Sequence, residues 1–203
     1  MADKPHPALF KLQHLVSDLS KVDRRHYKLN TDTRESDVEH SFSVAMLCWF
    51  ILTNNRIDLD LSLVLQYALA HDFVERYAGD TNTFASPKQR QAKIQKEKVA
   101  LQRFGEEFGD FPSLVDVMQR YETKEDSESL FVWTVDKMQP LILSDMDGNW
   151  RPYNELGINY ETFSEKYADL LTQASPYCKE IFDSLIQYCQ STYYSRPNPS
   201  QQR

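Results

Sequence analysis

The stretch from His71 to Asp80, which reads His-Asp-Phe-Val-Glu-Arg-Tyr-Ala-Gly-Asp, contains residue types that could bind a metal ion and activate water. The adjacent His71 and Asp72 offer one nitrogen and one oxygen ligand, which suit Mn, Fe, Co, Ni or Zn better than Ca or Mg. Glu75 follows His71 by four residues, so both side chains would share one face of a helix. A carboxylate at that position could orient or deprotonate a metal-bound water.

A second histidine, His40, is expected in the first turn of a helix. Ser36 and Glu39 have the spacing of a capping box, which predicts that this helix begins near Ser36. Apolar residues follow at helical spacing and turn His40 toward the core: they are Val44, Leu47, Cys48 and Ile51. A buried imidazole needs a partner, which is either an ordinary hydrogen bond in the core or a metal ion.

Asp136 lies within the strongly apolar run 130–139 and also needs a partner there, such as a cation, a hydrogen-bond donor or a metal. A salt bridge, or exposure on the wet side of the helix, would satisfy this carboxylate taken alone. Together, however, two histidines and two aspartates come from three predicted helices in the order His, His-Asp, Asp. Such a set can converge in the core of a helical bundle and leave coordination positions for water and substrate.

This order resembles the H…HD…D ligand pattern of the HD-domain phosphohydrolase superfamily. The stretch 71–80 is similar to the H-D-x-x-E-x-x-x-G-D motif of its 5′-deoxynucleotidase branch, and it fills that motif without a gap. The segment Asp136-Lys137 is similar to the Ala-Asp-Lys segment of that branch, with Val135 in place of Ala. The acidic pair typical of (p)ppGpp hydrolases, the extra histidines of dGTP triphosphohydrolases and the Gly-Tyr-Pro of cyclic-dinucleotide phosphodiesterases are absent. The resemblance spans roughly residues 20 to 145.

The resemblance implies an all-α HD-domain helical bundle with a metal site in its core. It implies one divalent metal ion, of an identity that the sequence leaves open among Mn, Co, Fe, Ni and Zn. The implied ligands are His40, His71, Asp72 and Asp136. Asp72 and Glu75 would form the catalytic pair, with Glu75 serving the attacking water.

The resemblance also implies a set of substrate-binding residues, which are Arg25, His26, Asp80 and Thr83. Arg25 lies fifteen residues before His40, as the family's phosphate-binding arginine does, although Arg24 beside it leaves the assignment open by one position. Asp80 and Thr83 would touch the sugar. His26 stands where the family often has Trp, which leaves base and sugar specificity open.

The length of 203 residues and the hydrophobic content of 41% predict a single well-buried domain over residues 1–194, with a flexible tail at 195–203. The pattern is helical almost throughout, and strand-like alternation is weak. The predicted helices are 8–22, 36–54, 60–77, 87–108, 112–122, 127–148, 160–174 and 177–193. Pro140 is expected to kink or end the helix that carries Asp136, and Gly79 is expected to stop a helix.

The net charge of −7 argues against a nucleic-acid partner but leaves a small anionic substrate possible, because a metal and Arg25 would set the local field. Basic residues between Lys88 and Lys98 could attract nucleotides, although a solvated helix face is the more common use of such charges. The odd count of three cysteines fits a reducing compartment, and neither a signal-peptide core nor a membrane-spanning run is present. We therefore expect a cytoplasmic protein without a membrane partner.

The branch often forms dimers, so a homodimer is expected. Aromatic residues of the C-terminal helices could supply its interface or belong to the core, which is their more common place. These residues are Phe163, Tyr167, Tyr177, Phe182 and Tyr188.

These observations lead us to expect a metal-dependent 5′-nucleotidase that hydrolyses deoxynucleoside 5′-monophosphates to deoxynucleoside and phosphate. One alternative is an HD phosphohydrolase that acts on dNTPs or another small phosphate ester, a possibility kept open by His26. Another is a non-catalytic metal-binding HD module, against which Glu75 argues, because a scaffold needs no water-activating carboxylate.

Overall fold

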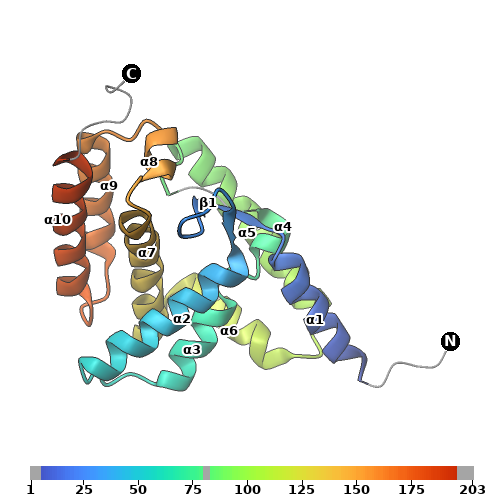
Figure 1. Ribbon diagram of the computed structural model, residues 1–203. Coiled ribbons are helices and arrows are strands. Elements are labelled where there is room, and N and C mark those ends of the chain that lie inside the picture. Colours follow the sequence, from blue (N-terminus) through green and yellow to red (C-terminus); the bar gives the residue numbers. More distant parts are fainter. Residues whose placement is uncertain (1–5, 80–82, 196–203) are drawn as a thin grey trace.

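The computed structural model describes residues 6–79 and 83–195, and helices make up most of this part of the chain (Figure 1). The helices are α1 (Pro7–Leu19), α2 (Asp37–Asn54), α3 (Leu61–Ala70), α4 (Glu75–Ala78), α5 (Pro87–Glu107), α6 (Pro112–Thr123), α7 (Ser127–Asp147), α8 (Arg151–Glu155), α9 (Tyr160–Gln173) and α10 (Lys179–Ser195). A single two-stranded sheet pairs β1 (Asp23–Tyr27) with β2 (Arg34–Ser36). The expected all-α class is confirmed.

Helices α2, α3 and α7 pack on one another and form the centre of the bundle, while α10 covers the far side of α7 (Figure 1). Their facing side chains are fully buried, as the helical spacing of apolar residues requires. Examples are Val44, Cys48, Val64, Phe131 and Val135. The three elements that carry the predicted metal ligands therefore meet in the core.

The predicted capping box at the start of α2 is present. Ser36 Oγ accepts a hydrogen bond from the backbone N–H of Glu39, and the Glu39 carboxylate accepts one from the backbone N–H of Ser36 at 2.9 Å. This reciprocal cap fixes where the helix begins, so His40 falls in the first turn.

The helix predicted over 60–77 is wrong in one respect, because it breaks into α3 and α4. The chain between Ala70 and Glu75 forms a tight turn, in which Phe73 N–H donates to Ala70 O and Glu75 N–H donates to Asp72 O. Gly79, with φ of 73°, caps α4 as expected, because this left-handed backbone favours glycine. Glu75 therefore begins a new helix and does not share a helix with His71.

Sequence analysis did not predict the hairpin of β1 and β2, because the alternation of polar and apolar residues in these segments is weak. Its strands run antiparallel, with Asp23 opposite Ser36 and Tyr27 opposite Arg34. The ring of Tyr27 lies between two guanidinium groups, with Arg34 at 3.9 Å and Arg151 of α8 at 3.8 Å from the ring centroid. These contacts fasten the hairpin to α8.

Of the two effects expected of Pro140, a kink or an end of the helix, the end does not occur, because Pro140 lies inside α7. The helix continues to Asp147 and is capped by Gly148. The missing N–H of Pro140 leaves only one helical hydrogen bond unmade. Met138 and Leu141, on either side of the proline, are buried in the core, and this packing holds the helix together across the gap.

The C-terminal part of the chain packs most of its aromatic residues inward. Phe163, Tyr167 and Phe182 are buried, whereas Tyr177 and Tyr188 are exposed. Ser195, where a flexible tail was predicted to begin, is the last residue of α10, and residues 196–203 lie outside the described part of the chain. All three cysteines are buried and free. No helix in the described ranges is long and apolar enough to cross a membrane.

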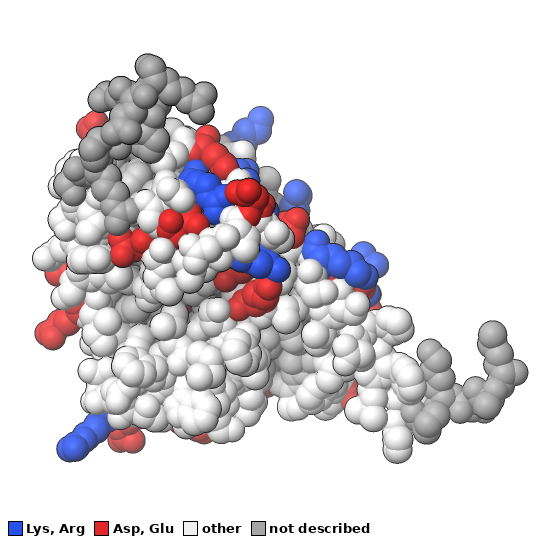
Figure 2. All heavy atoms as spheres, viewed as in Figure 1, with Lys and Arg blue, Asp and Glu red and all other residues white. Residues whose placement is uncertain are grey.

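Charged side chains are unevenly distributed on the face shown in Figure 2. They gather around the hairpin and α8, while the region over α2 is largely free of them. Several apolar side chains of α2 are exposed: Phe42, Met46, Trp49 and Phe50.

Candidate active site

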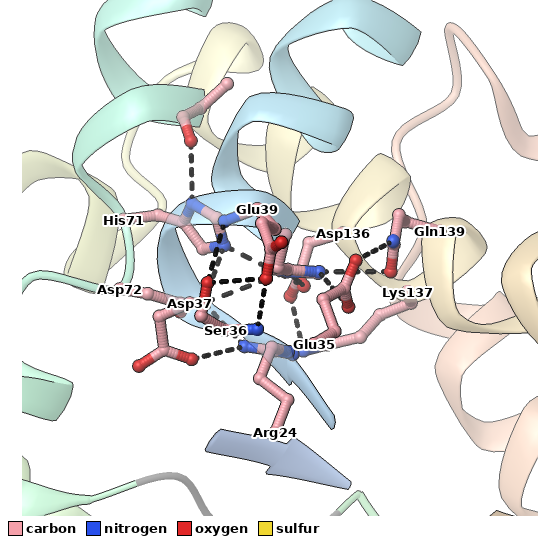
Figure 3. A network of polar contacts seen from close by, with 12 residues as sticks. Arg24, Glu35, Ser36, Asp37, Glu39, His71, Asp72, Asp136, Lys137 and Gln139 are labelled. Atoms are coloured by element: carbon pink, nitrogen blue, oxygen red, sulfur yellow. Dashed lines mark hydrogen bonds and ion pairs between the residues drawn. The ribbon is translucent and has the colours of Figure 1, made fainter. Parts of the chain in front are cut away.

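The predicted metal ligands converge in the core of the bundle (Figure 3). Ligand atoms of His40, His71 and Asp72 all lie within 4.8 Å of one another. Asp136 Oδ1 lies 2.9 Å from His40 Nε2 and 3.8 Å from His71 Nε2. Residues separated by almost a hundred positions in the sequence are thus brought to the spacing that a shared metal ion requires.

The hydrogen bonds of the two histidines leave Nε2 as the nitrogen that faces the cluster. His40 Nδ1 donates to Gln139 Oε1 at 3.0 Å, and His71 Nδ1 donates to the backbone oxygen of Ala68 at 2.9 Å. A neutral imidazole that donates through Nδ1 presents a lone pair at Nε2. His71 Nε2 lies 3.2 Å from Asp72 Oδ2 and has no hydrogen-bond partner among the described residues. A buried lone pair facing a carboxylate is unfavourable without a cation, so these residues fit a divalent metal.

Two basic side chains contact the carboxylates of the cluster. Arg24 Nη1 lies 2.6 Å from Asp72 Oδ2, and Lys137 Nζ lies 2.6 Å from Asp136 Oδ2. Burial would raise the pKa of Asp72, but the charge that His71 carries when protonated and the guanidinium group of Arg24 outweigh it and hold that pKa below its usual range. The ammonium group of Lys137 likewise outweighs burial and holds the pKa of Asp136 well below its usual range. Both carboxylates are therefore ionised, as metal ligands must be.

A short chain of hydrogen bonds through Gln139 and Glu35, both labelled in Figure 3, fixes the orientation of the His40 ring. Gln139 accepts from His40 through Oε1 and donates through Nε2 to Glu35 Oε1 at 2.8 Å. Burial raises the pKa of Glu35 to about 7, although Arg24 opposes this shift. Partners of this kind hold a metal-binding histidine in one tautomer. Sequence reasoning missed Gln139, although its position three residues after Asp136 places both on one face of α7.

Glu75 lies next to the cluster, at the start of α4, and is only 5% exposed. Carboxylate oxygens of Glu75, Asp37 and Asp72 lie within 4.8 Å of one another. Glu75 therefore faces the cluster from the side of Asp72, where a carboxylate could orient a water molecule. Sequence reasoning did not single out Asp37, which is the buried first residue of α2.

The residues that line a pocket beside the cluster fall into two chemical groups, a charged set and a largely apolar set, which we call its charged wall and its aromatic wall. The charged wall consists of Arg24, Arg25, Asp72, Glu75, Lys93, Asp136 and Lys137. The other wall is largely aromatic and aliphatic and consists of His26, Thr83, Phe84, Pro140, Pro152, Tyr153, Leu156, Tyr167 and Leu170. Although the whole chain has a net charge of −7, the lining contains four basic groups and three carboxylates, so a bound cation would make it strongly positive.

The structure places three of the four predicted substrate-binding residues on this pocket. Arg25, His26 and Thr83 line it, whereas Asp80 lies outside the described residues. His26 packs edge-on against Tyr153, with ring centroids 5.9 Å apart. Burial and the neighbouring Arg24 lower the pKa of His26 to about 3, so its ring is neutral.

The aromatic wall was missed by sequence reasoning. The hydroxyl groups of Tyr153 and Tyr167 share a hydrogen bond of 2.8 Å, and Phe84 packs on both rings. Tyr153 belongs to α8 and Tyr167 to α9, far along the chain from the metal-ligand motifs. Aromatic residues in these helices are typical of any core, so the sequence carries no signal that these two reach the pocket.

With this geometry established, comparisons with known proteins identify the class. A model of the HD domain family matches residues 16–177, so the chain belongs to the HD domain family. No match was found among curated proteins.

Solved structures share the fold at low sequence identity. A protein from Magnetospirillum magnetotacticum MS-1, described as a predicted metal-dependent phosphohydrolase, aligns with a TM-score of 0.73 and 21% identity over 93% of this chain and 98% of its own. A conserved hypothetical protein from Pyrococcus furiosus aligns with a TM-score of 0.62 and 21% identity over 88% and 99% of the two chains. A protein from Pyrococcus horikoshii OT3 gives 0.61 and 20% over 88% and 98%.

These findings support the general part of the sequence expectation, which is an HD-domain protein with a His/Asp cluster able to bind a divalent metal. The deoxynucleotidase branch is a finer assignment that rests on the sequence motif and the pocket.

Proposed function

We propose that this protein is a metal-dependent phosphohydrolase, and that its substrates are deoxynucleoside 5′-monophosphates. One observation carries the proposal: a cluster fit for a metal, flanked by Glu75, lies on the charged wall of a pocket whose other wall is aromatic. A phosphate monoester of a nucleoside has the same division, with a dianionic end and a planar apolar end. The motif from His71 to Asp80 supports the same choice of substrate.

In this mechanism, His40, His71, Asp72 and Asp136 would hold the metal. When bound, a divalent ion would supply Lewis-acid polarisation of a phosphoryl oxygen and lower the pKa of a coordinated water. Glu75 orients the attacking water and accepts its proton on a carboxylate oxygen.

Arg24, Arg25 and Lys137 of the charged wall bind the substrate's phosphoryl group. Arg24 Nη1 already contacts Asp72, so its guanidinium lies beside the cluster and offsets charge on the oxygens of the group in transfer. Arg25 lies next to it on β1 and adds a second basic group at the exposed edge of the pocket.

The aromatic wall binds the nucleoside. Phe84 and Tyr153 offer ring faces and edges to a base. Because one hydroxyl of the Tyr153–Tyr167 pair donates to the other, the pair keeps one proton for a further acceptor. The neutral ring of His26 adds a further polar atom to this wall, because its Nε2 has no hydrogen-bond partner within the described part of the chain. Thr83 lies on the same wall, and Asp80 stays a proposed contact to the sugar.

The deciding experiment measures phosphate release with Mn, Co, Ni, Zn and Mg against 5′-dNMPs, 5′-NMPs and dNTPs. We expect orthophosphate from dNMPs, and a loss of at least about a hundredfold in kcat in Glu75→Ala, since general-base catalysis contributes roughly 10²–10⁴-fold. Glu106→Ala, on the exposed face of α5, is the matched control.

Two outcomes would change the assignment. Release of triphosphate from dNTPs would favour the dNTP-hydrolysing alternative. A protein that binds metal stoichiometrically but releases phosphate from none of these compounds would contradict the nucleotidase and favour another ester or a non-catalytic metal-binding module. The cytoplasmic location and the homodimer remain predictions.

A further inference from the structure

Helix α5 carries several basic residues, and Lys93 differs from its neighbours. Lys88, Lys96 and Lys98 are exposed, as expected for a solvated helix face. Lys93 is half-buried, and it is the lysine of this helix that lines the pocket together with Asp72 and Glu75. The general expectation of a solvated face therefore holds for these three neighbours and fails at Lys93.

Lys93 is held in place by a carboxylate on its own helix. Its Nζ lies 3.1 Å from Glu97 Oε1, one helical turn further along α5. Burial disfavours the charged form, but Glu97, Glu75 and Asp72 outweigh it and raise the pKa of Lys93, so the ammonium stays charged. An ammonium has three N–H donors, and the contact with Glu97 occupies one of them.

The partner of Lys93 distinguishes it from the other basic groups beside the cluster. Arg24 and Lys137 each lie 2.6 Å from a carboxylate of the predicted metal site, so part of their charge is used in balancing those ligands. The partner of Lys93 is Glu97, which is not one of those ligands. Lys93 also lines the pocket, so the N–H donors that Glu97 does not occupy can donate to whatever occupies it.

We propose that Lys93 is a substrate-binding residue that donates to the phosphoryl oxygens of the phosphate ester, with Glu97 as the residue that positions it. This inference rests on the proposed function, because it takes a phosphate ester as the substrate. It adds a binding group from α5 to those from β1 and α7. The phosphoryl group would then be held by basic residues from three separate elements. These contacts would fix its orientation and offset its negative charge.

The test compares Lys93→Met with Lys96→Met, which removes an equal charge from the exposed face of the same helix. Binding of orthophosphate to the metal-loaded protein is measured by calorimetry, alongside KM and kcat for the best dNMP. Loss of a charge-assisted hydrogen bond predicts a Kd for orthophosphate, and a KM, raised roughly ten- to a hundredfold in Lys93→Met. We expect changes below about twofold in Lys96→Met and an unchanged metal content in both.

Two further variants separate binding from folding. Lys93→Arg keeps the charge and is expected to recover most of the phosphate affinity. Glu97→Gln keeps the lysine but loosens it, which predicts an intermediate Kd. Circular dichroism confirms that each variant is folded.

The results separate this inference from the proposed function. Equal phosphate affinity in the wild type, Lys93→Met and Lys96→Met would overturn the role of Lys93, even if the wild type hydrolyses dNMPs. A wild type that binds no orthophosphate would overturn it as well. Conversely, weakened phosphate binding in Lys93→Met alone would support the inference, even if none of the nucleotides tested is hydrolysed.

Discussion

Arg24 Nη1 lies 2.6 Å from Asp72 Oδ2, one position before the arginine that the sequence spacing indicated. Side chains alternate along β1, so Arg24 is half-buried against the cluster while Arg25 is exposed. Both still line the pocket. The hairpin therefore places Arg24 against the cluster and Arg25 at the exposed edge of the pocket, and the contribution of each to activity can be measured separately.

We expect Arg24→Gln to lower kcat/KM by roughly ten- to a hundredfold, because it removes a charge-assisted hydrogen bond beside the reacting group. Arg25→Gln changes the same charge at the exposed edge and should cost less than about fivefold. Steady-state kinetics on one dNMP compare the two variants. A larger loss of kcat/KM in Arg25→Gln than in Arg24→Gln would show that Arg25, the arginine indicated by the sequence spacing, makes the more important contact.

Removal of a predicted metal ligand should abolish metal-dependent stabilisation. The wild type should show a higher Tm with added Mn than with a chelator, since a ligand at a hundred times its Kd stabilises the folded state by about 2.7 kcal/mol. His71→Ala should lose that difference and bind less metal by elemental analysis. His14→Ala, an exposed histidine of α1, is the control and should behave like the wild type. An unchanged metal content in His71→Ala would contradict the proposed ligand set.

The bond between Gln139 and His40 should tune metal affinity. Gln139→Leu removes the acceptor of His40 Nδ1, and changes behind a metal ligand weaken metal binding by roughly ten- to a hundredfold. The Kd for Mn, measured by calorimetry, tests this, with the exposed Gln119→Leu as the control. If Gln139→Leu binds metal as tightly as Gln119→Leu, the hydrogen bond serves only packing.

The contact between Tyr27 and Arg151 should position the hairpin that carries Arg24. Arg151 stacks on Tyr27, and it also donates to Asp32 Oδ1 at 2.8 Å and to Thr31 O at 2.6 Å. Arg151→Ala should raise KM several-fold and leave metal affinity unchanged, because the metal cluster lies on other elements. Arg151→Lys keeps the charge but loses the planar stacking, so it should fall between the wild type and Arg151→Ala. An unchanged KM in Arg151→Ala would show that β1 holds its position without α8.

The expected homodimer can be tested on the exposed apolar side chains of α2. Trp49 and Phe50 are 47% and 64% exposed, and a groove of about 620 Å³ borders the first turns of the same helix at Val38 and Phe42. Exposed apolar groups and a recess along one helix suit a self-complementary twofold contact. Light scattering should give a dimer for the wild type and a monomer for the double variant Trp49→Glu/Phe50→Glu. A monomeric wild type would show that the homodimer prediction is wrong.

Much of the site could be predicted because its signals are local. The spacing of Ser36 and Glu39 fixed the start of α2 and hence the position of His40, and the capping box is present in the structure. The motif around His71 identified the same histidine, aspartate and glutamate that converge in the core. Short-range geometry of this kind depends on few neighbours, so the sequence carries it almost completely.

Other features depended on contacts between distant parts of the chain. The hairpin forms because Tyr27 stacks on Arg151 of α8, which weak alternation along β1 could not indicate. The tight turn at His71 interrupts an otherwise good helical pattern. Pro140 stays inside α7 because the turns around it are buried, so packing overrides local propensity.

The sequence by itself determined the residue types of the predicted metal site, their order along the chain and the helices that carry His40 and Asp136, because ligand chemistry and helical periodicity depend on local patterns. Only the tertiary structure decided which arginine meets Asp72, that Gln139 orients His40, and that Tyr153, Tyr167 and Lys93 line the pocket. The physical reason is that each of these contacts depends on the direction in which a side chain points. A hydrogen bond or ion pair depends on where two side chains point, and that is set by how whole helices pack.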